Sequence, residues 1–134
     1  MRAQASVEYI AIVFIVIAML IPIWAYVAGV KEQASTQMSL SYAQTAADRI
    51  ADGADLVGSQ GASARLSVRV YIPYGVNHTI ITGNSMVFGL SLAEGYSDVV
   101  AVSSSGLNGT LPTAEGEYWI VLESNGTAVN IWPA

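Results

Sequence analysis

Few residues in this chain are of a type that supports catalysis or metal binding. The chain has 134 residues, a single histidine (His78) and no cysteine. Nucleophilic catalysis needs a general base beside its nucleophile, and zinc sites need several cysteine or histidine ligands. We therefore expect no catalytic residue, no cofactor and no metal site, and an enzyme is the least favoured class of protein.

Three aspartates form the one acidic cluster. Asp48, Asp52 and Asp55 are separated by four and three residues, which places them on one face of a helix. Such a face can attract a cation. The alternative, which we favour, is a solvated acidic edge on which Asp48 and Asp52 flank Arg49.

The chain contains three Asn-x-Thr sequons, beginning at Asn77, Asn108 and Asn125. We expect all three to lie in turns or at loop ends of an exported domain, where N-linked glycans can be attached. The low charge of this region fits a surface covered by sugars, and it also fits a surface rich in serine and threonine without sugars.

Composition narrows the class of protein further. The net charge is −5, and the five cations are scattered along the chain, so no basic patch is available for nucleic acid. Charged residues make up 11% of the chain, against about 25% in ordinary soluble domains. Because disulfides are also absent, stability must come from core packing, from glycans or from assembly with neighbours.

The first 30 residues are the most distinctive part of the sequence. No charged residue lies between Glu8 and Lys31, a stretch longer than the roughly 20 apolar residues that cross a bilayer. A secretory signal has a shorter apolar segment and a small-residue cleavage site after it, which is missing before Lys31. If the chain is cut, a position ahead of the apolar segment, after Ala3, is favoured.

The motif that opens this segment is Gln4-Ala5-Ser6-Val7-Glu8-Tyr9-Ile10. It resembles the archaeal class III signal peptides of type IV pilin-like proteins. The resemblance implies that a prepilin peptidase cuts between Ala3 and Gln4, so that residues 1–3 are a leader peptide. Glu8 is then the glutamate at mature position five, and the apolar segment stays on the protein as the filament core.

Glu8 needs a physical explanation, because a carboxylate at the edge of hydrocarbon is costly unless it is paired. The resemblance implies that Glu8 neutralises the α-amine of Gln4, of its own chain or of a neighbour, and so sets the register of assembly. Alternatively, Glu8 is solvated and only favours the start of the helix. Cyclisation of an N-terminal Gln4 would remove the amine.

The sequence predicts an α+β fold, with one long helix over residues 4–57 and a small antiparallel β domain over residues 62–134. Residues 10–30 are apolar on all sides, Pro22 predicts a kink or an unwound turn, and Trp24 and Tyr26 suit either an aromatic belt or packing. From Val27 onward a weak apolar stripe recurs every three or four residues. The stripe consists of Val27, Val30, Ala34, Met38, Tyr42, Ala46, Ile50 and Ala54.

After Gly61 the hydrophobic period changes to two, which predicts about six short strands. They cover residues 64–72, 78–82, 85–92, 98–103, 117–124 and 127–132. We expect a turn at Gly83-Asn84, a loop over residues 104–116 and a type I′ hairpin at Asn125-Gly126. A helix of roughly 80 Å is too long for this domain to cover, so its first half needs other partners.

These features together predict a pilin, the structural subunit of an archaeal type IV-like pilus that serves adhesion and surface attachment. The resemblance implies a homopolymer on the cell surface, a precursor in the cytoplasmic membrane, and a prepilin peptidase, an assembly ATPase and a membrane platform protein as partners. The alternative is a single-pass membrane-anchored surface protein whose β domain binds a ligand. An archaellin-like motility subunit is less favoured, because that family usually lacks the glutamate that Glu8 supplies.

Overall fold

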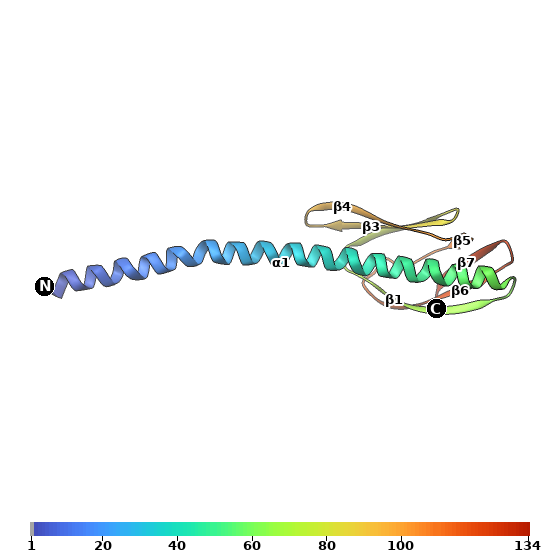
Figure 1. The fold of residues 1–134 in the computed structure, drawn as a ribbon, viewed down its shortest axis with the longest axis horizontal. Helices are drawn as coiled ribbons and strands as arrows, with labels where there is room; N and C mark the ends of the chain where they lie inside the picture. Colours follow the sequence, from blue (N-terminus) through green and yellow to red (C-terminus); the bar gives the residue numbers. More distant parts are fainter. Residues whose placement is uncertain (1) are drawn as a thin grey trace. The chain divides into compact units, whose positions relative to one another are not determined.

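The computed structural model describes residues 2–134. It contains one helix, α1 (Arg2–Gln60), followed by a β domain, which is the α+β architecture that the sequence predicts (Figure 1). The chain divides into two compact units, Met1–Ser35 and Thr36–Ala134.

Helix α1 runs through Pro22 without a break in its helical backbone. Of the two features predicted at Pro22, a kink or an unwound turn, the unwound turn is therefore not formed, because the loss of the one backbone donor that proline lacks leaves the helix on either side in place. The helix ends at Gln60, three residues beyond the predicted Val57. Gly61 stops it with a positive φ of 89°, a conformation that glycine adopts without a steric penalty.

The β domain has seven strands in two sheets. The strands are β1 (Arg65–Ile72), β2 (Val76–Thr82), β3 (Ser85–Leu92), β4 (Gly95–Val102), β5 (Gly106–Gly109), β6 (Gly116–Ser124) and β7 (Ala128–Pro133). One sheet has the order β1-β6-β7-β5 and the other the order β2-β3-β4.

Strand β5 lies where the sequence predicts a loop, and it pairs with β7 in the parallel direction. The prediction of a loop over residues 104–116 is therefore wrong for this segment, and the domain is not purely antiparallel. Its sequence, Gly-Leu-Asn-Gly, has no β-branched residue and no alternation to detect. Pairing with β7, rather than local propensity, makes it a strand.

The turns differ in how well the sequence predicts them. Thr82 pairs with Ser85, so Gly83-Asn84 forms the expected two-residue turn, and Gly83 has a φ of 63°. The prediction of a type I′ hairpin at Asn125-Gly126 is wrong. Ser124 ends β6 and Ala128 begins β7, which leaves three residues between the strands, and of Asn125 and Gly126 only Gly126 has a positive φ.

The side chain of Asn125 explains this longer loop. Its Oδ1 accepts hydrogen bonds from the backbone amides of Thr127 and Ala128 and from the Thr127 hydroxyl, at 2.8–3.0 Å. This arrangement is an Asx turn, which replaces the backbone geometry that a type I′ turn would require.

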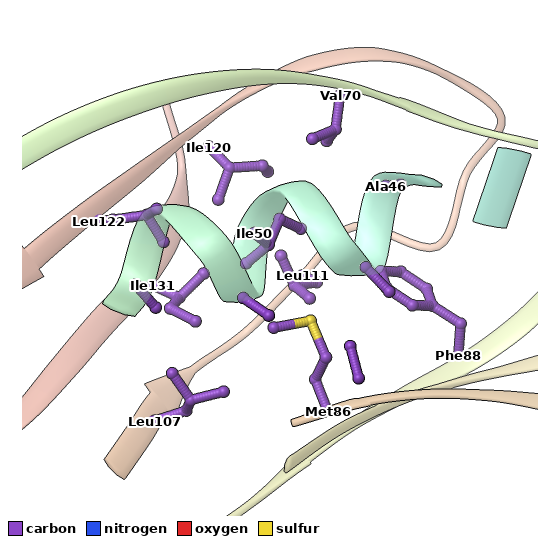
Figure 2. Close-up of a cluster of buried hydrophobic side chains, with 14 of the residues drawn as sticks. Ala46, Ile50, Val70, Met86, Phe88, Leu107, Leu111, Ile120, Leu122 and Ile131 are labelled. Atoms are coloured by element: carbon purple, nitrogen blue, oxygen red, sulfur yellow. The ribbon is translucent and has the colours of Figure 1, made fainter. Parts of the chain in front are cut away.

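The core of the domain forms around the second half of α1, which packs against both sheets (Figure 1). Figure 2 shows Ile50 between Met86 and Phe88 of β3 on one side and Ile120 and Leu122 of β6 on the other. All five side chains are fully buried. The helix is thus an internal layer of the domain.

The buried surface of α1 is made mainly of small residues. The predicted stripe is right for Ala46, Ile50 and Ala54, but Met38 and Tyr42 are exposed. The prediction missed further buried positions, because two sheets cover more of the helix than one stripe. These positions are Thr36, Ala43, Ala47, Ala51, Gly53 and Val57.

Gly53 shows how closely helix and sheet approach each other. A Cβ atom added there would lie 2.6 Å from Cδ1 of Leu122 and 3.1 Å from Cγ2 of Val68. The absence of a side chain at this position therefore sets the distance between α1 and the sheet that contains β1 and β6.

Candidate assembly surface

The first half of α1 is an exposed apolar surface, which we call the assembly surface and define as residues 7–30. Every residue from position 2 to position 35 is exposed. The most apolar 18-residue window of the helix has a mean hydropathy of 2.8, and none of it is buried. Within residues 2–134, this helix is long and apolar enough to cross a membrane.

The aromatic residues near the end of this surface are exposed as well. Trp24 and Tyr26 are 75% and 74% exposed. Neither packs against the rest of the described chain, so the packing interpretation for them requires a partner outside it. Lys31 and Glu32, the first charged residues after Glu8, follow within two turns.

The residues of the expected cleavage site lie in the first turn of α1. Ala3, Gln4 and Glu8 are all helical and exposed. Gln4 and Glu8 are four residues apart, which places them on the same face of the helix, one turn from each other. Within residues 2–134 the Glu8 carboxylate has no ion-pair or hydrogen-bond partner.

The aspartate cluster does not gather into a cation site. Asp48 accepts a hydrogen bond of 2.8 Å from Gln44 and, like Asp52, is exposed. In the part of the chain that the structure describes, no group of three metal-ligating side chains comes together. The favoured interpretation, a solvated acidic edge, agrees with the exposure of Asp48 and Asp52.

Asp55 has a different role, which the sequence analysis missed. Its carboxylate accepts hydrogen bonds from the hydroxyl of Ser103 and from the backbone amide of Ser104, the latter at 2.7 Å. Burial by itself raises the pKa of Asp55, but the hydrogen bonds from Ser103, Ser104 and Ser105 outweigh it and leave the pKa below its usual value. The hydrogen bonds of Asp55 thus connect the loop after β4 to α1. In the sequence, the available signal was the run Ser103-Ser104-Ser105, which begins at the last residue of the predicted strand 98–103.

The three sequon asparagines are exposed, but only one lies in a turn. Asn125 is in the loop between β6 and β7, as expected. Asn77 lies in β2, at the point where the pairing register with β3 shifts, and Asn108 lies in β5. The prediction of turns or loop ends is therefore wrong for these two asparagines, although both remain on the surface.

His78 and Tyr71 complete the set of residues that could do chemistry. The imidazole of His78 lies on the backbone of Gly89 in the neighbouring strand, where an added Cβ would collide with it. The hydroxyl of Tyr71 donates a hydrogen bond of 2.8 Å to Glu115, and this bond raises the pKa of Tyr71. Tyr71 also makes an edge-to-face contact with Tyr42.

The fold and the surface together define an α+β protein with a long, exposed and apolar N-terminal helix. Comparisons with protein-family models, with curated protein sequences and with solved structures found no match. Its function is therefore inferred from the assembly surface and from the N-terminal motif.

Proposed function

We propose that this chain is a pilin, the structural subunit of an archaeal type IV-like pilus that serves adhesion and surface attachment. The observation that carries the proposal is the division of α1. From Thr36 onward the helix is the internal layer of a β domain, whereas the assembly surface before it is apolar and uncovered by the described chain.

An apolar helical surface of this size needs a lipid or protein environment. Before assembly, lipid covers residues 7–30 of the precursor in the cytoplasmic membrane. After assembly, the same residues of neighbouring copies cover one another in the filament core. Lipid chains are as apolar as these side chains, so packing and polar pairing decide whether the subunits associate.

Glu8 provides the polar pairing, with the α-amine of Gln4 as its partner. Cleavage between Ala3 and Gln4 by a prepilin peptidase creates an α-amine one helical turn from the Glu8 carboxylate, on the same face. The pair can form within one chain or between neighbouring chains. Pairing between chains sets the axial register, because an unpaired carboxylate in an apolar filament core is strongly disfavoured.

The remaining parts follow from this arrangement. The β domain coats the outside of the filament and presents its exposed sequons, so N-linked glycans are expected on it. An assembly ATPase and a membrane platform protein drive extraction of the subunits from the membrane. The domain provides attachment rather than chemistry.

The second candidate is a single-pass membrane-anchored surface protein with a ligand-binding β domain. The same helix favours it, since residues 7–30 are long enough to remain in the bilayer permanently. This candidate predicts an uncut N-terminus and monomers in the membrane fraction.

Intact-mass analysis of the protein purified from its native host separates the two candidates. The pilin predicts a first residue of Gln4, or its cyclised form, whereas Met1 as the first residue contradicts it. Negative-stain microscopy of sheared cell surfaces is expected to show thin filaments that contain this chain.

Replacing Glu8 tests the pairing step. In Glu8→Gln the amine of Gln4 loses its carboxylate partner, and we expect at least a tenfold loss of sheared filaments with unchanged processing. Glu32→Gln is the matched control, because Glu32 is exposed on the same helix outside the assembly surface. Filament yields that fall equally in both variants would contradict the role of Glu8.

A further inference from the structure

The edges of the two sheets differ in how they are protected. The edge of β1 is contacted at one point by Arg49, whose guanidinium donates a hydrogen bond of 3.4 Å to the backbone oxygen of Arg69. The edges of β2 and β5 contact each other, and Thr79 of β2 donates to the backbone oxygen of Leu111. Each of these three edges therefore has at least one contact from elsewhere in the domain.

The fourth edge, that of β4, is open. Strand β4 pairs with β3 over eight consecutive residues without a bulge (Figure 1). Within residues 2–134, no backbone or side-chain group other than those of β3 makes a hydrogen bond to its backbone. It contains no proline and no lysine, the residues that commonly protect an edge, and its single charge is Asp98.

The direction of the unpaired groups follows from the hairpin. Leu92 pairs with Gly95 across a two-residue turn, so these two residues form a hydrogen-bonded pair, and the pairs alternate from there. The amide of Ser103 accordingly points toward the β3 side, where it donates to Asn84. It follows that the N–H and C=O groups of Tyr96, Asp98, Val100 and Val102 point away from β3.

We propose that β4 is a self-pairing edge, at which two copies of this chain join their three-stranded sheets antiparallel about a two-fold axis. The axis passes beside Val100, so that Val100 faces Val100 of the other copy. Asp98 then faces Val102 rather than another Asp98, which avoids a like-charge pair. Residues 98, 100 and 102 of each copy exchange about six backbone hydrogen bonds.

The side chains support this register. Ile80, Val87 and Val100 lie opposite one another on the outer face of the sheet. Ile80 and Val100 are 49% and 50% exposed. Pairing at Val100 joins this apolar row to the same row of the second copy, and it places Val99 opposite Ala101 on the inner face. Tyr96 lies four residues from the axis, so the two Tyr96 residues are roughly 27 Å apart.

Disulfide trapping tests the register directly, because the chain contains no cysteine of its own. The full chain is kept in an excess of detergent micelles, which separates the apolar helices, and is then oxidised. Across a hydrogen-bonded pair the Cα atoms are about 5.5 Å apart, within disulfide range. Val100→Cys is therefore expected to give a cross-linked dimer on a non-reducing gel, and Tyr96→Cys, although more exposed, is expected to remain a monomer.

A second pair of variants tests the edge without cysteine. Val100→Lys puts two ammonium groups at the axis and is expected to abolish the dimer measured by mass photometry. Ile80→Lys adds the same charge at equal exposure on β2 and is expected to retain it. No cross-link in Val100→Cys, equal cross-linking in Tyr96→Cys, or a dimer that survives Val100→Lys would each overturn the proposal. None of these results depends on whether the chain forms a pilus.

Discussion

The hydrogen bonds of Asp55 provide the sharpest test of how helix and sheet are held together. We consider Asp55→Asn, which keeps the size of the side chain and removes its charge. A hydrogen bond to a charged group contributes about 1.5–3 kcal/mol, and one between neutral groups about 0.5–1.5 kcal/mol. Both bonds from the serine loop go to Oδ1, which asparagine keeps, so the variant can accept both as bonds between neutral groups, and the expected loss at pH 7 is about 1–2 kcal/mol.

The pH dependence of this loss has a definite sign. The pKa of Asp55 is lowered in the folded protein from its ordinary value of 3.8. The folded state therefore binds the proton more weakly than the unfolded state does. The contribution of the charge is complete above pH 3.8 and disappears as the pH falls through the lower folded value.

The measurement is denaturant unfolding of the full chain in detergent, followed by tryptophan fluorescence between pH 7 and pH 2.5. The difference between the wild-type chain and Asp55→Asn is expected to be constant above about pH 5 and to close below pH 3.8. Asp52→Asn is the control, because Asp52 is exposed and is expected to change stability by less than about 0.5 kcal/mol. Equal effects of the two variants at pH 7, or a difference that does not decrease as the pH falls below 3.8, would refute the role of Asp55.

Two further predictions concern packing and turn structure. Gly53→Ala places a methyl group 2.6 Å from Leu122 Cδ1, and we expect a net loss of about 1–2 kcal/mol in denaturant unfolding once the better helix propensity of alanine is counted. A stability equal to or above that of the wild-type chain would contradict this expectation, because it would show that the sheet shifts away from the helix and makes room for the methyl group without cost. In protein made without glycans, Asn125→Ala removes the acceptor of the Asx turn and is expected to cost about 1 kcal/mol in thermal unfolding. Asn108→Ala is its control, and equal losses in the two would contradict the turn's contribution.

Local patterns predict the regular parts of this fold well. The apolar run and the absence of glycine and proline between Lys31 and Asp52 predict α1, and alternation of apolar and polar residues predicts strands such as β1 and β3. Strand β5 escapes prediction because its pairing with β7 is a tertiary effect that its own four residues do not encode. The loop at Asn125 differs from the expected turn because a side-chain oxygen, rather than the backbone alone, satisfies the amides.

The burial of α1 is predicted less well, for a related reason. A stripe at helical spacing assumes a single covering layer, but two sheets pack on this helix and select small residues on several sides. Met38 and Tyr42 fit the spacing yet remain exposed. Gly53 and the alanines outside the stripe look unremarkable in the sequence, although they determine how closely the sheets approach.

The distribution of small and bulky residues along α1 helps to explain why the assembly surface is apolar. The domain core is complete with the small side chains of α1 beyond Thr36 and the large side chains of the two sheets. The bulky residues of positions 7–30 contribute nothing to that core, so folding of the domain does not account for their apolar character. An environment outside the described chain must account for it, and both lipid and other copies of the helix satisfy this requirement. The identity of the first residue in the native protein decides between permanent anchoring and assembly, because only the processed chain has an amine at Gln4 for Glu8 to pair with.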